Sequence, residues 1–393
     1  MIRRPPRSTP KPSSAASDVY KRQINDTEFG KTIAMSEDGT FIAVIAQDTL
    51  YPNLPANNQR KGSVHIFKLK DNGTEYEEVS THSPTADFHR IGSSGNMYQI
   101  GISDDGLTVV YQEQNNNTNT GSGIILKKNT NNDQYTQIHK FSVTDGGSTA
   151  EVAISGDASR VAVSAFSEKE IDIYKLNPGN GQYVKEGNTI ENTNVNVVNF
   201  GKSLSFNTDR SRLVVGTNNG FYILGTIGAG GVWASVQEFL GDAGTAGFNF
   251  GIAVSISGNG ECIVSTYPNQ PGGTINVYKK DANANTFTLD TAINTTYGGM
   301  GKQFGHSIVI SKDGSKIITG ATGHDTPNNN NGMIVVYKKD GNNYVVDDEI
   351  ITGQVANERF GHDVAITNNG MQIAVSAPDF NNDNGFVRIF KFE

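Results

Sequence analysis

The chain has 393 residues and contains a single cysteine, Cys262. One cysteine excludes an internal disulfide framework and a cysteine-ligated zinc cluster, and its apolar strand context predicts an inert core thiol. No stretch repeats apolar residues at a sustained helical spacing, which argues against helical bundles and βαβ units. Charged residues make up 18% of the chain and glycine supplies 44 residues. This balance is typical of a turn-rich all-β protein.

Recognisable catalytic motifs are also missing. The sequence has no Gly-x-Ser-x-Gly elbow, no His-Glu-x-x-His pair and no phosphate-binding glycine loop ahead of a helix. The glycine-rich stretch at residues 228–231 lies between two expected strands and is explained by a hairpin loop. We therefore expect that the chain is not an enzyme and binds no cofactor.

A repeated motif dominates the sequence: Phe-Gly, five residues, Ser or Thr, then Asp-Gly or Asn-Gly. It is clearest at residues 304–314 and 360–370. The residue that opens the turn recurs at intervals of 50 to 67 residues, at Ser36, Ser103, Ser155, Asn207, Ser257, Ser311 and Thr367. A period of this length indicates one supersecondary unit stacked several times. The count predicts seven units.

Each copy predicts four short strands. In the first copy, residues 33–35 and 41–44 flank the turn Glu37-Asp38-Gly39, and an Asp-Gly between alternating apolar residues is a strong hairpin signal. A strand that ends in an aromatic residue follows, and the expected fourth strands contain Tyr76, Tyr135, Tyr183, Trp233, Phe287 and Tyr344. Seven units of four antiparallel strands predict an all-β, seven-bladed β-propeller, with the Phe of each Phe-Gly pair wedged between blades.

This repeat resembles the FG-GAP family in its short form, which occurs in bacterial and protist surface proteins. The likeness runs from Phe-Gly through the Ser-x-Asp-Gly turn to Ser376-Ala377-Pro378 and the strand at residues 386–390, and it covers residues 24–393. The family includes the integrin α-chain propeller. The resemblance therefore implies an extracellular or cell-surface protein that binds partners through loops and holds calcium in some blades.

The calcium sites of the integrin-type repeat do not carry over to these hairpins. Their Asp-x-Asp-x-Asp-Gly loop is replaced here by Ser-x-Asp-Gly, which has too few oxygen ligands for a cation that takes six to eight. The segment 379–385 offers the alternate oxygens of Asp379, Asn381 and Asp383. These residues are a weak calcium candidate, and a solvated Asn/Asp turn is the alternative.

Residues 1–23 do not share the repeat and are rich in Pro, Ser and Arg. They lack the apolar segment of a signal peptide and resemble translated sequencing-adapter sequence. We expect a non-native or disordered segment at 1–23 and the propeller at 24–393, with the native N-terminus and any signal missing. The last copy then lacks a native fourth strand, whose position by spacing falls near residues 12–13.

The charge of the chain bears on its partners. The formal net charge is −8, and removing the +5 of residues 1–23 leaves −13 for the propeller (−8 − 5). An acidic surface argues against nucleic-acid binding, and we expect no membrane insertion.

The third position of the repeat gives the best candidate functional ring. It is occupied by Lys31, Lys202, Ile252, His306 and His362. On an innermost strand these side chains approach the channel mouth, where His306 and His362 could bind an anion or a metal. The alternative is a wet channel lining without function.

Loops between the second and third strands supply a second set of candidates. They are longest in copies one, six and seven, at residues 47–61, 323–331 and 378–384, and they share one face. Loops on a rigid scaffold commonly carry binding sites, although Asn-rich drift also explains them. The candidate partner contacts are Tyr51, Leu54, Pro55, His324, Asp379 and Phe380.

Three functions are compatible with these observations. We expect a non-catalytic adhesion or binding module that recognises protein partners through loops on one face. A glycan-binding propeller is the alternative, but a repeated lectin should repeat its polar and aromatic loop residues, and this chain repeats only core residues. An enzyme at the channel mouth is the third option, because its residues could converge from several blades.

Overall fold

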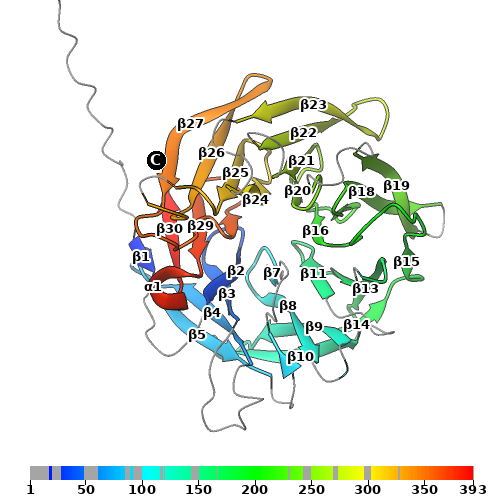
Figure 1. The fold of residues 1–393 in the computed structure, drawn as a ribbon. Coiled ribbons are helices and arrows are strands. Elements are labelled where there is room, and N and C mark those ends of the chain that lie inside the picture. Colours follow the sequence, from blue (N-terminus) through cyan, green and yellow to red (C-terminus); the bar gives the residue numbers. More distant parts are fainter. Residues whose placement is uncertain are drawn as a thin grey trace, which may run out of the picture.

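The fold was analysed in a computed structural model of the chain. The structure describes residues 17–19, 28–47, 61–84, 89–91, 100–115, 118, 120–142, 150–165, 167–228, 231–241, 249–268, 273–295, 302–325 and 328–392. Seven antiparallel sheets stand around a central axis (Figure 1). The predicted seven-bladed β-propeller is confirmed.

The strands follow each other from the axis outward in every blade. Blade one consists of β2 (Phe29–Met35), β3 (Phe41–Ala46), β4 (Ser63–Leu69) and β5 (Tyr76–His82). Blade two consists of β7 (Ile100–Ile102), β8 (Thr108–Asn115), β9 (Thr120–Lys128) and β10 (Tyr135–Ser142), with β6 (His89–Arg90) beside β8. Blade three consists of β11 (Ala150–Ile154), β12 (Arg160–Ala165), β13 (Glu170–Asn177) and β14 (Gln182–Lys185), with β15 (Ile190–Glu191) beside β13. Blade four consists of β16 (Ser203–Phe206), β17 (Arg212–Gly216), β18 (Gly220–Ile227) and β19 (Val232–Leu240). Blade five consists of β20 (Val254–Ile256), β21 (Cys262–Tyr267), β22 (Thr274–Lys280) and β23 (Phe287–Asn294). Blade six consists of β24 (Phe304–Ile310), β25 (Lys316–Ala321), β26 (Met333–Asp340) and β27 (Asn343–Thr352).

The seventh blade closes the ring with a strand from the other end of the chain. It contains β28 (Val364–Ile366), β29 (Gln372–Ala377), β30 (Phe386–Lys391) and, on the outside, β1 (Ser17–Val19), with the short α1 (Phe380–Asp383) between β29 and β30. Strand β1 pairs antiparallel with β30, Asp18 facing Arg388. The expected position near residues 12–13 is therefore corrected to 17–19, inside the segment expected to lie outside the propeller.

The hydrophobic core is divided among the blade junctions. Among the described residues, the buried apolar side chains form seven clusters, and each cluster joins two neighbouring blades. Cys262 belongs to the cluster between blades five and six, where burial raises the pKa of its thiol. No blade buries its faces alone, which is why the repeat count and the ring are linked.

Each Ser-x-Asp-Gly turn is held by its own polar side chains. In blade one Ser36 Oγ donates to Asp38 Oδ1 at 2.9 Å and accepts from Phe41 N at 2.9 Å, while Asp38 also accepts from Thr40 N at 2.8 Å. Burial opposes ionisation of Asp38, but the hydrogen bonds from Thr40 and Ser36 outweigh it and lower its pKa. The turn carboxylate is thus used for the hairpin.

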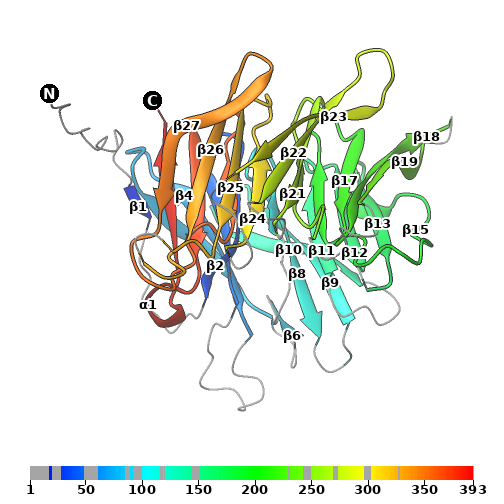
Figure 2. The ribbon, with the colours of Figure 1, turned by 45° about the horizontal axis from the view of Figure 1, so that its top comes forward.

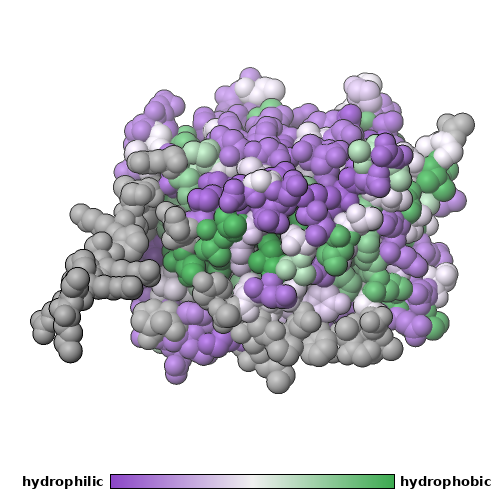
Figure 3. Space-filling model, turned by 90° about the horizontal axis from the view of Figure 1, so that it is seen from above, coloured by the Kyte–Doolittle hydropathy of each residue, from purple (hydrophilic) through white to green (hydrophobic). Residues whose placement is uncertain are grey.

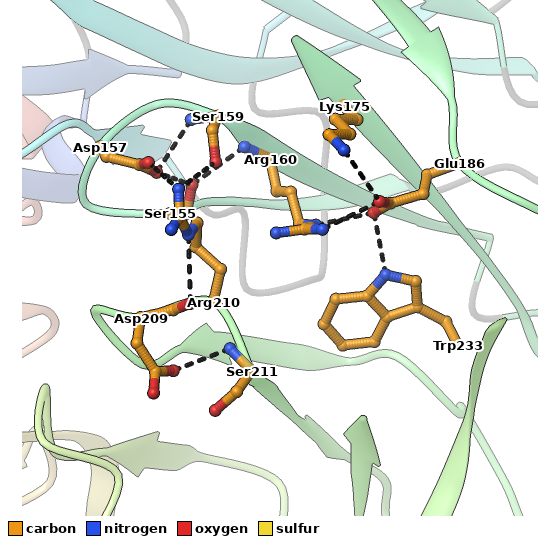
Figure 4. Close-up of polar contacts among 10 residues, drawn as sticks. All are labelled: Ser155, Asp157, Ser159, Arg160, Lys175, Glu186, Asp209, Arg210, Ser211 and Trp233. Atoms are coloured by element: carbon orange, nitrogen blue, oxygen red, sulfur yellow. Dashed lines mark hydrogen bonds and ion pairs between the residues drawn. The ribbon is translucent and has the colours of Figure 1, made fainter. Parts of the chain in front are cut away.

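The fourth strand fastens to the same turn. Tyr76 donates its hydroxyl to Gly39 O, and Tyr135, Tyr183 and Tyr344 bond in the same way to the turns of their own blades. Figure 4 shows the equivalent region of blades three and four, where Glu186 accepts from both Arg160 and Trp233, and Arg210 of blade four pairs with Asp157 of blade three. The aromatic residues expected in the fourth strands are therefore structural.

The two faces of the ring differ in what projects from them. The β22–β23 and β26–β27 hairpins project from the face that carries the turns, and α1 projects from the opposite face (Figure 2). On the side of the ring seen in Figure 3, the upper part is largely hydrophilic and hydrophobic residues lie in a row below it. Within the described part of the chain, no helix is long and apolar enough to cross a membrane.

Candidate functional site

The Phe-Gly pair forms a bulge at the start of the innermost strand. In blade one Phe29 faces Ala46 and Thr32 faces Ile45, so two residues on β2 have no counterpart on β3. Blade six interrupts its register in the same way between Phe304 and Ile308. A bulge re-aims the side chains that follow it. Here those side chains are the third and fourth positions of the repeat.

Two backbone conformations fix this bulge. The glycine has a φ of +80° to +94° in all five Phe-Gly copies, which disfavours other residues. A Cβ on Gly305 would lie 2.8 Å from Thr266 Cβ of the preceding blade. The residue before each Phe is also left-handed, so that its carbonyl accepts the N–H of the third position, as from Lys31 N to Glu28 O at 3.1 Å and from His306 N to Gln303 O at 3.1 Å.

Five blades line one cavity in the channel with residues from the third to fifth positions of the repeat. Its volume is about 80 Å³. Its lining residues are Lys31, Thr32, Ser203, Ala253, Val254, His306, Ser307, Ile308, His362 and Asp363. The prediction that Lys31, His306 and His362 meet at the channel mouth is consistent with this placement. Lys202 lies near enough for its charge to act on His306.

His306 has a defined tautomer in this cavity. Its ring lies 4.8 Å from the ring of His362, centroid to centroid, and its Nδ1 is 3.0 Å from the backbone oxygen of His362. A carbonyl oxygen only accepts, so Nδ1 carries the proton and Nε2 keeps its lone pair. Burial lowers the pKa of His306 to about 4, and the cations of Lys31, Arg359 and Lys202 contribute. The ring is a neutral base at pH 7.

His362 is also neutral. Burial is the main cause that lowers its pKa well below the usual value; the charges of His306 and Lys31 add to this effect, and a hydrogen bond to the backbone of Lys31 opposes it. Its Nδ1 is buried and makes no hydrogen bond among the described residues. The hydroxyl of Thr32, which lines the same cavity, is likewise buried without a hydrogen-bond partner among them. Two such polar atoms in one cavity indicate a place for water or a polar ligand.

Asp363 joins blade seven to blade one beside the histidines. Its Oδ2 accepts from Ile33 N at 2.8 Å and its Oδ1 from Val364 N at 2.9 Å. Burial raises the pKa of this carboxyl to about 7 despite both hydrogen bonds. The group therefore titrates near neutral pH at the wall of the cavity.

Cations act on the pair of histidines, and each of these cations interacts with a carboxylate. Lys31 Nζ bonds Glu28 Oε2 at 2.8 Å, and Arg359 Nε lies 3.1 Å from Asp379 Oδ2. Burial lowers the pKa of Lys202, an effect that Glu151 opposes. The charges that act on His306 are nonetheless the three cations. This positive field disfavours a metal ion between His306 and His362.

A second histidine arrangement in blade one has the order of a catalytic triad. Ser63 Oγ lies 2.7 Å from His65 Nε2, and His65 Nδ1 lies 2.9 Å from Glu78 Oε1. However, Ser63 is 0% and His65 2% exposed, and His65 packs edge-on against Phe29. A nucleophile must reach its substrate. We therefore assign this relay a structural role at the junction of blades one and seven.

The opposite end of the channel carries a ring of turn residues that we call the collar. It consists of the variable residue of each Ser-x-Asp-Gly turn: Glu37, Asp104, Gly156, Thr208, Gly258, Lys312 and Asn368. Backbone bonds link neighbouring members, including Glu37 N to Asp104 O at 3.0 Å and Asn368 N to Glu37 O at 3.0 Å. Lys312 crosses to pair with Asp104 and, at 3.4 Å, with Glu37. The collar separates an inner cavity of about 180 Å³ from an outer depression of about 440 Å³.

Of the loop candidates, the structure describes His324, Asp379 and Phe380. Tyr51, Leu54 and Pro55 lie outside the described residues. Phe380 packs edge-on against Phe386 with ring centroids 4.8 Å apart, so it belongs to the core between blades six and seven. His324 is half-buried and its backbone oxygen accepts from Gly332 N.

The weak calcium candidate is folded as a left-handed turn. Asn381, Asn382 and Asp383 have φ values of 53° to 65°, and Asp379 pairs with Arg359. Asp383 uses its backbone oxygen to accept from Glu28 N. Within the described residues, no three His, Cys, Asp or Glu side chains are grouped so that they could hold a metal. The predicted set Asp379, Asn381 and Asp383 thus has no gathered geometry here.

Sequence reasoning missed Thr32 and Asp363, which follow the predicted third position. The fourth position reads Thr32, Glu151, Ser203, Ala253, Ser307 and Asp363 in the copies that the structure describes. Its polarity on a strand next to the channel was the available signal. The carboxylate of Asp363 accepts its hydrogen bond from the backbone N–H of Ile33, which is 330 residues away in the chain.

Comparison with known proteins gives likeness of fold. No model of a known protein family matches the chain, and no sequence of a curated protein matches it. A candidate 6-phosphogluconolactonase from Bacteroides uniformis is 13% identical, with a TM-score of 0.57 over 82% of this chain and 85% of that one. The periplasmic gluconolactonase PpgL of Pseudomonas aeruginosa is 12% identical, with a TM-score of 0.56 over 86% and 87%. The Cps50 (Swd1) β-propeller domain of Myceliophteria thermophila is 9% identical, with a TM-score of 0.59 over 96% and 100%.

These comparisons correct the functional expectation. The expected non-catalytic adhesion or glycan-binding module was wrong, because propellers with this fold include proteins named as lactonases. The accompanying expectation that the chain is not an enzyme is corrected on the same ground. At 9–13% sequence identity, the likeness to these structures shows a shared fold alone. The resemblance to the FG-GAP repeat and the expected cell-surface location stay predictions.

Proposed function

We propose that this protein is a hydrolase that opens small lactones or related esters at the Phe-Gly mouth of its channel. The observation that carries the proposal is His306, a neutral ring in a cavity with its Nδ1 proton held by His362 O at 3.0 Å. That bond leaves Nε2 as the basic atom. A positioned base of this kind contributes typically about 10²–10⁴-fold to a hydrolytic step. The names of structurally similar lactonases support the reaction class.

In the proposed reaction His306 Nε2 removes a proton from water as the water oxygen attacks the carbonyl carbon. The carbonyl electrons move to oxygen, and the positive field of Lys31 and Lys202 stabilises that oxyanion. Collapse of the tetrahedral intermediate breaks the ring C–O bond. The alkoxide then takes the proton back from His306, so that one water is consumed and one hydroxy acid forms. The low pKa of His306 makes it a weak base but a ready donor in this last step.

The size of the cavity limits how the substrate sits. Its volume of about 80 Å³ accepts the reacting group of a small substrate together with water. The rest of the substrate must lie outside, toward the face that carries α1 (Figure 2). This arrangement supports small substrates that insert only their reacting group.

A panel of γ- and δ-lactones, followed by acid release at constant pH, tests the proposal. We expect turnover by the wild type and at least a 100-fold loss of kcat/KM in His306→Gln. Ser63→Ala is the matched control, because it removes the hydroxyl of the buried relay, and it should retain turnover. The proposal fails if no lactone or ester is hydrolysed, or if Ser63→Ala abolishes turnover while His306→Gln does not.

A further inference from the structure

We propose that the cavity at the Phe-Gly mouth recognises one oxyanion, a carboxylate or a phosphate monoester, through Lys31 and the hydroxyl of Thr32. The inference rests on the proposed function and names its substrate class: the protein prefers acidic substrates and also binds acids that it cannot hydrolyse. It extends to the product, because ring opening of a lactone creates a carboxylate in this cavity.

Thr32 gives the first argument. Its side chain is 4% exposed and lines the cavity, and its hydroxyl oxygen is buried without a hydrogen-bond partner among the described residues. Leaving such a group unpaired costs roughly 1–3 kcal/mol. By contrast, the equivalent Ser307 donates to Gly361 O at 3.0 Å. Thr32 thus places a buried hydroxyl donor in the wall of the cavity, and its hydrogen-bonding capacity is unused among the described residues.

Lys31 gives the second argument. It lines the same cavity from the neighbouring position on β2, and its ammonium has three donors, of which Glu28 takes one at 2.8 Å. Consecutive residues of an ordinary strand point to opposite faces. The bulge between Phe29 and Thr32 is what brings both side chains to one cavity.

The other charges around the cavity are arranged so that an anion is tolerated. Asp363 is the carboxyl group in the lining, and both of its oxygens face backbone N–H groups at 2.8 and 2.9 Å. Glu28 and Asp379 pair with Lys31 and Arg359. The charges that reach His306 and His362 include the cations of Lys31 and Arg359. An oxyanion bound here meets donors and a positive field.

Proton NMR of the histidine ring signals in the full-length chain measures this binding directly. The probes are acetate and inorganic phosphate, with chloride at equal ionic strength as the non-oxyanion control. We expect saturable shifts of the His306 and His362 signals with acetate or phosphate and none with chloride. If only phosphate saturates, the recognised group is the phosphate monoester; if only acetate does, it is the carboxylate.

Two variants separate recognition from folding. Thr32→Val keeps the shape and removes the unpartnered hydroxyl, so we expect at least fivefold weaker oxyanion binding with an unchanged melting temperature. Lys31→Met should weaken binding further, while Ser205→Ala, in the deeper cavity, should leave it unchanged. Equal binding by wild type and Thr32→Val, or the absence of saturable shifts, overturns the proposal.

The test also distinguishes the two proposals. Oxyanion binding without hydrolysis of any lactone supports the recognition site and removes the hydrolase. Hydrolysis of neutral and acidic lactones at equal kcat/KM, with no oxyanion binding, supports the hydrolase and overturns the recognition site.

Discussion

The two ends of the central channel are built from the same seven-fold repeat, yet they differ in whether their polar side chains have hydrogen-bond or ion-pair partners. At the turn end the collar side chains Glu37, Asp104, Lys312 and Asn368 are paired with one another. At the Phe-Gly mouth His362 Nδ1 and Thr32 Oγ1 are buried without partners among the described residues. Buried polar groups in proteins are usually satisfied, and exceptions call for an explanation. The difference indicates that one end stabilises the ring and the other end is arranged for a ligand.

The pH dependence of turnover should show the largest effect that divides the two ends. His306 must be neutral to accept a proton, and its pKa is about 4. We expect kcat/KM to fall about tenfold per pH unit below pH 4 and to level off above pH 5. Lys312→Met, at the other end of the channel, should keep the same profile. A shift of the acid limb in Lys312→Met would show that the two ends are coupled and would break the comparison.

Asp363 provides the second test, through stability. Its folded pKa of about 7 exceeds the pKa of 3.8 of an ordinary aspartate, so the folded state binds more protons than the unfolded state between these values. Stability from this group is present below about pH 4 and is lost as the pH rises to 7. Asp363→Asn removes the dependence, and we expect the free energy of unfolding of wild type relative to the variant to fall by about 3 kcal/mol between pH 4 and 7. Chemical denaturation across this range measures it. A constant difference would mean that Asp363 ionises normally.

The collar should show the smallest effect. Lys312→Met leaves Asp104 and Glu37 without their cation, but these groups are partly exposed, so we expect a loss of about 1 kcal/mol at pH 7. Burial raises the pKa of Asp104 and Lys312 lowers it, so the variant raises it further. The deficit should therefore shrink as the pH falls and Asp104 becomes protonated. A deficit that stays equal at pH 4 and pH 7 in thermal melts would assign it to packing rather than charge.

The sequence predicted the ring because its markers are local. Gly305 has a φ of +84°, and the turn at Ser311 to Gly314 is closed by its own side chains, so both leave a signature in a few consecutive residues. The histidine pair was predicted for the same reason, since His306 and His362 occupy one repeat position. The repeat places these residues in one ring around the channel, but it does not predict the hydrogen-bond partners of each residue.

The remainder of the site depends on contacts between distant blades. The role of Asp363 comes from Ile33 in another blade, and the tautomer of His306 comes from the backbone oxygen of His362. The collar was missed because its seven positions vary from Gly to Lys, and such variation resembles drift. The relay of Ser63, His65 and Glu78 was hidden by a shift in register between Ile66 and Phe67, so the pairing of Glu78 could not be counted from the turn.

The collar affects how small molecules can pass through the channel. Because Lys312 bridges to Asp104 and Glu37 across the channel, its ion pairs narrow the turn end of the channel, opposite the Phe-Gly mouth. Under the proposed hydrolase function, substrate and product then share the Phe-Gly mouth. The proposed hydrolase would therefore release each product molecule through that mouth before the next substrate enters.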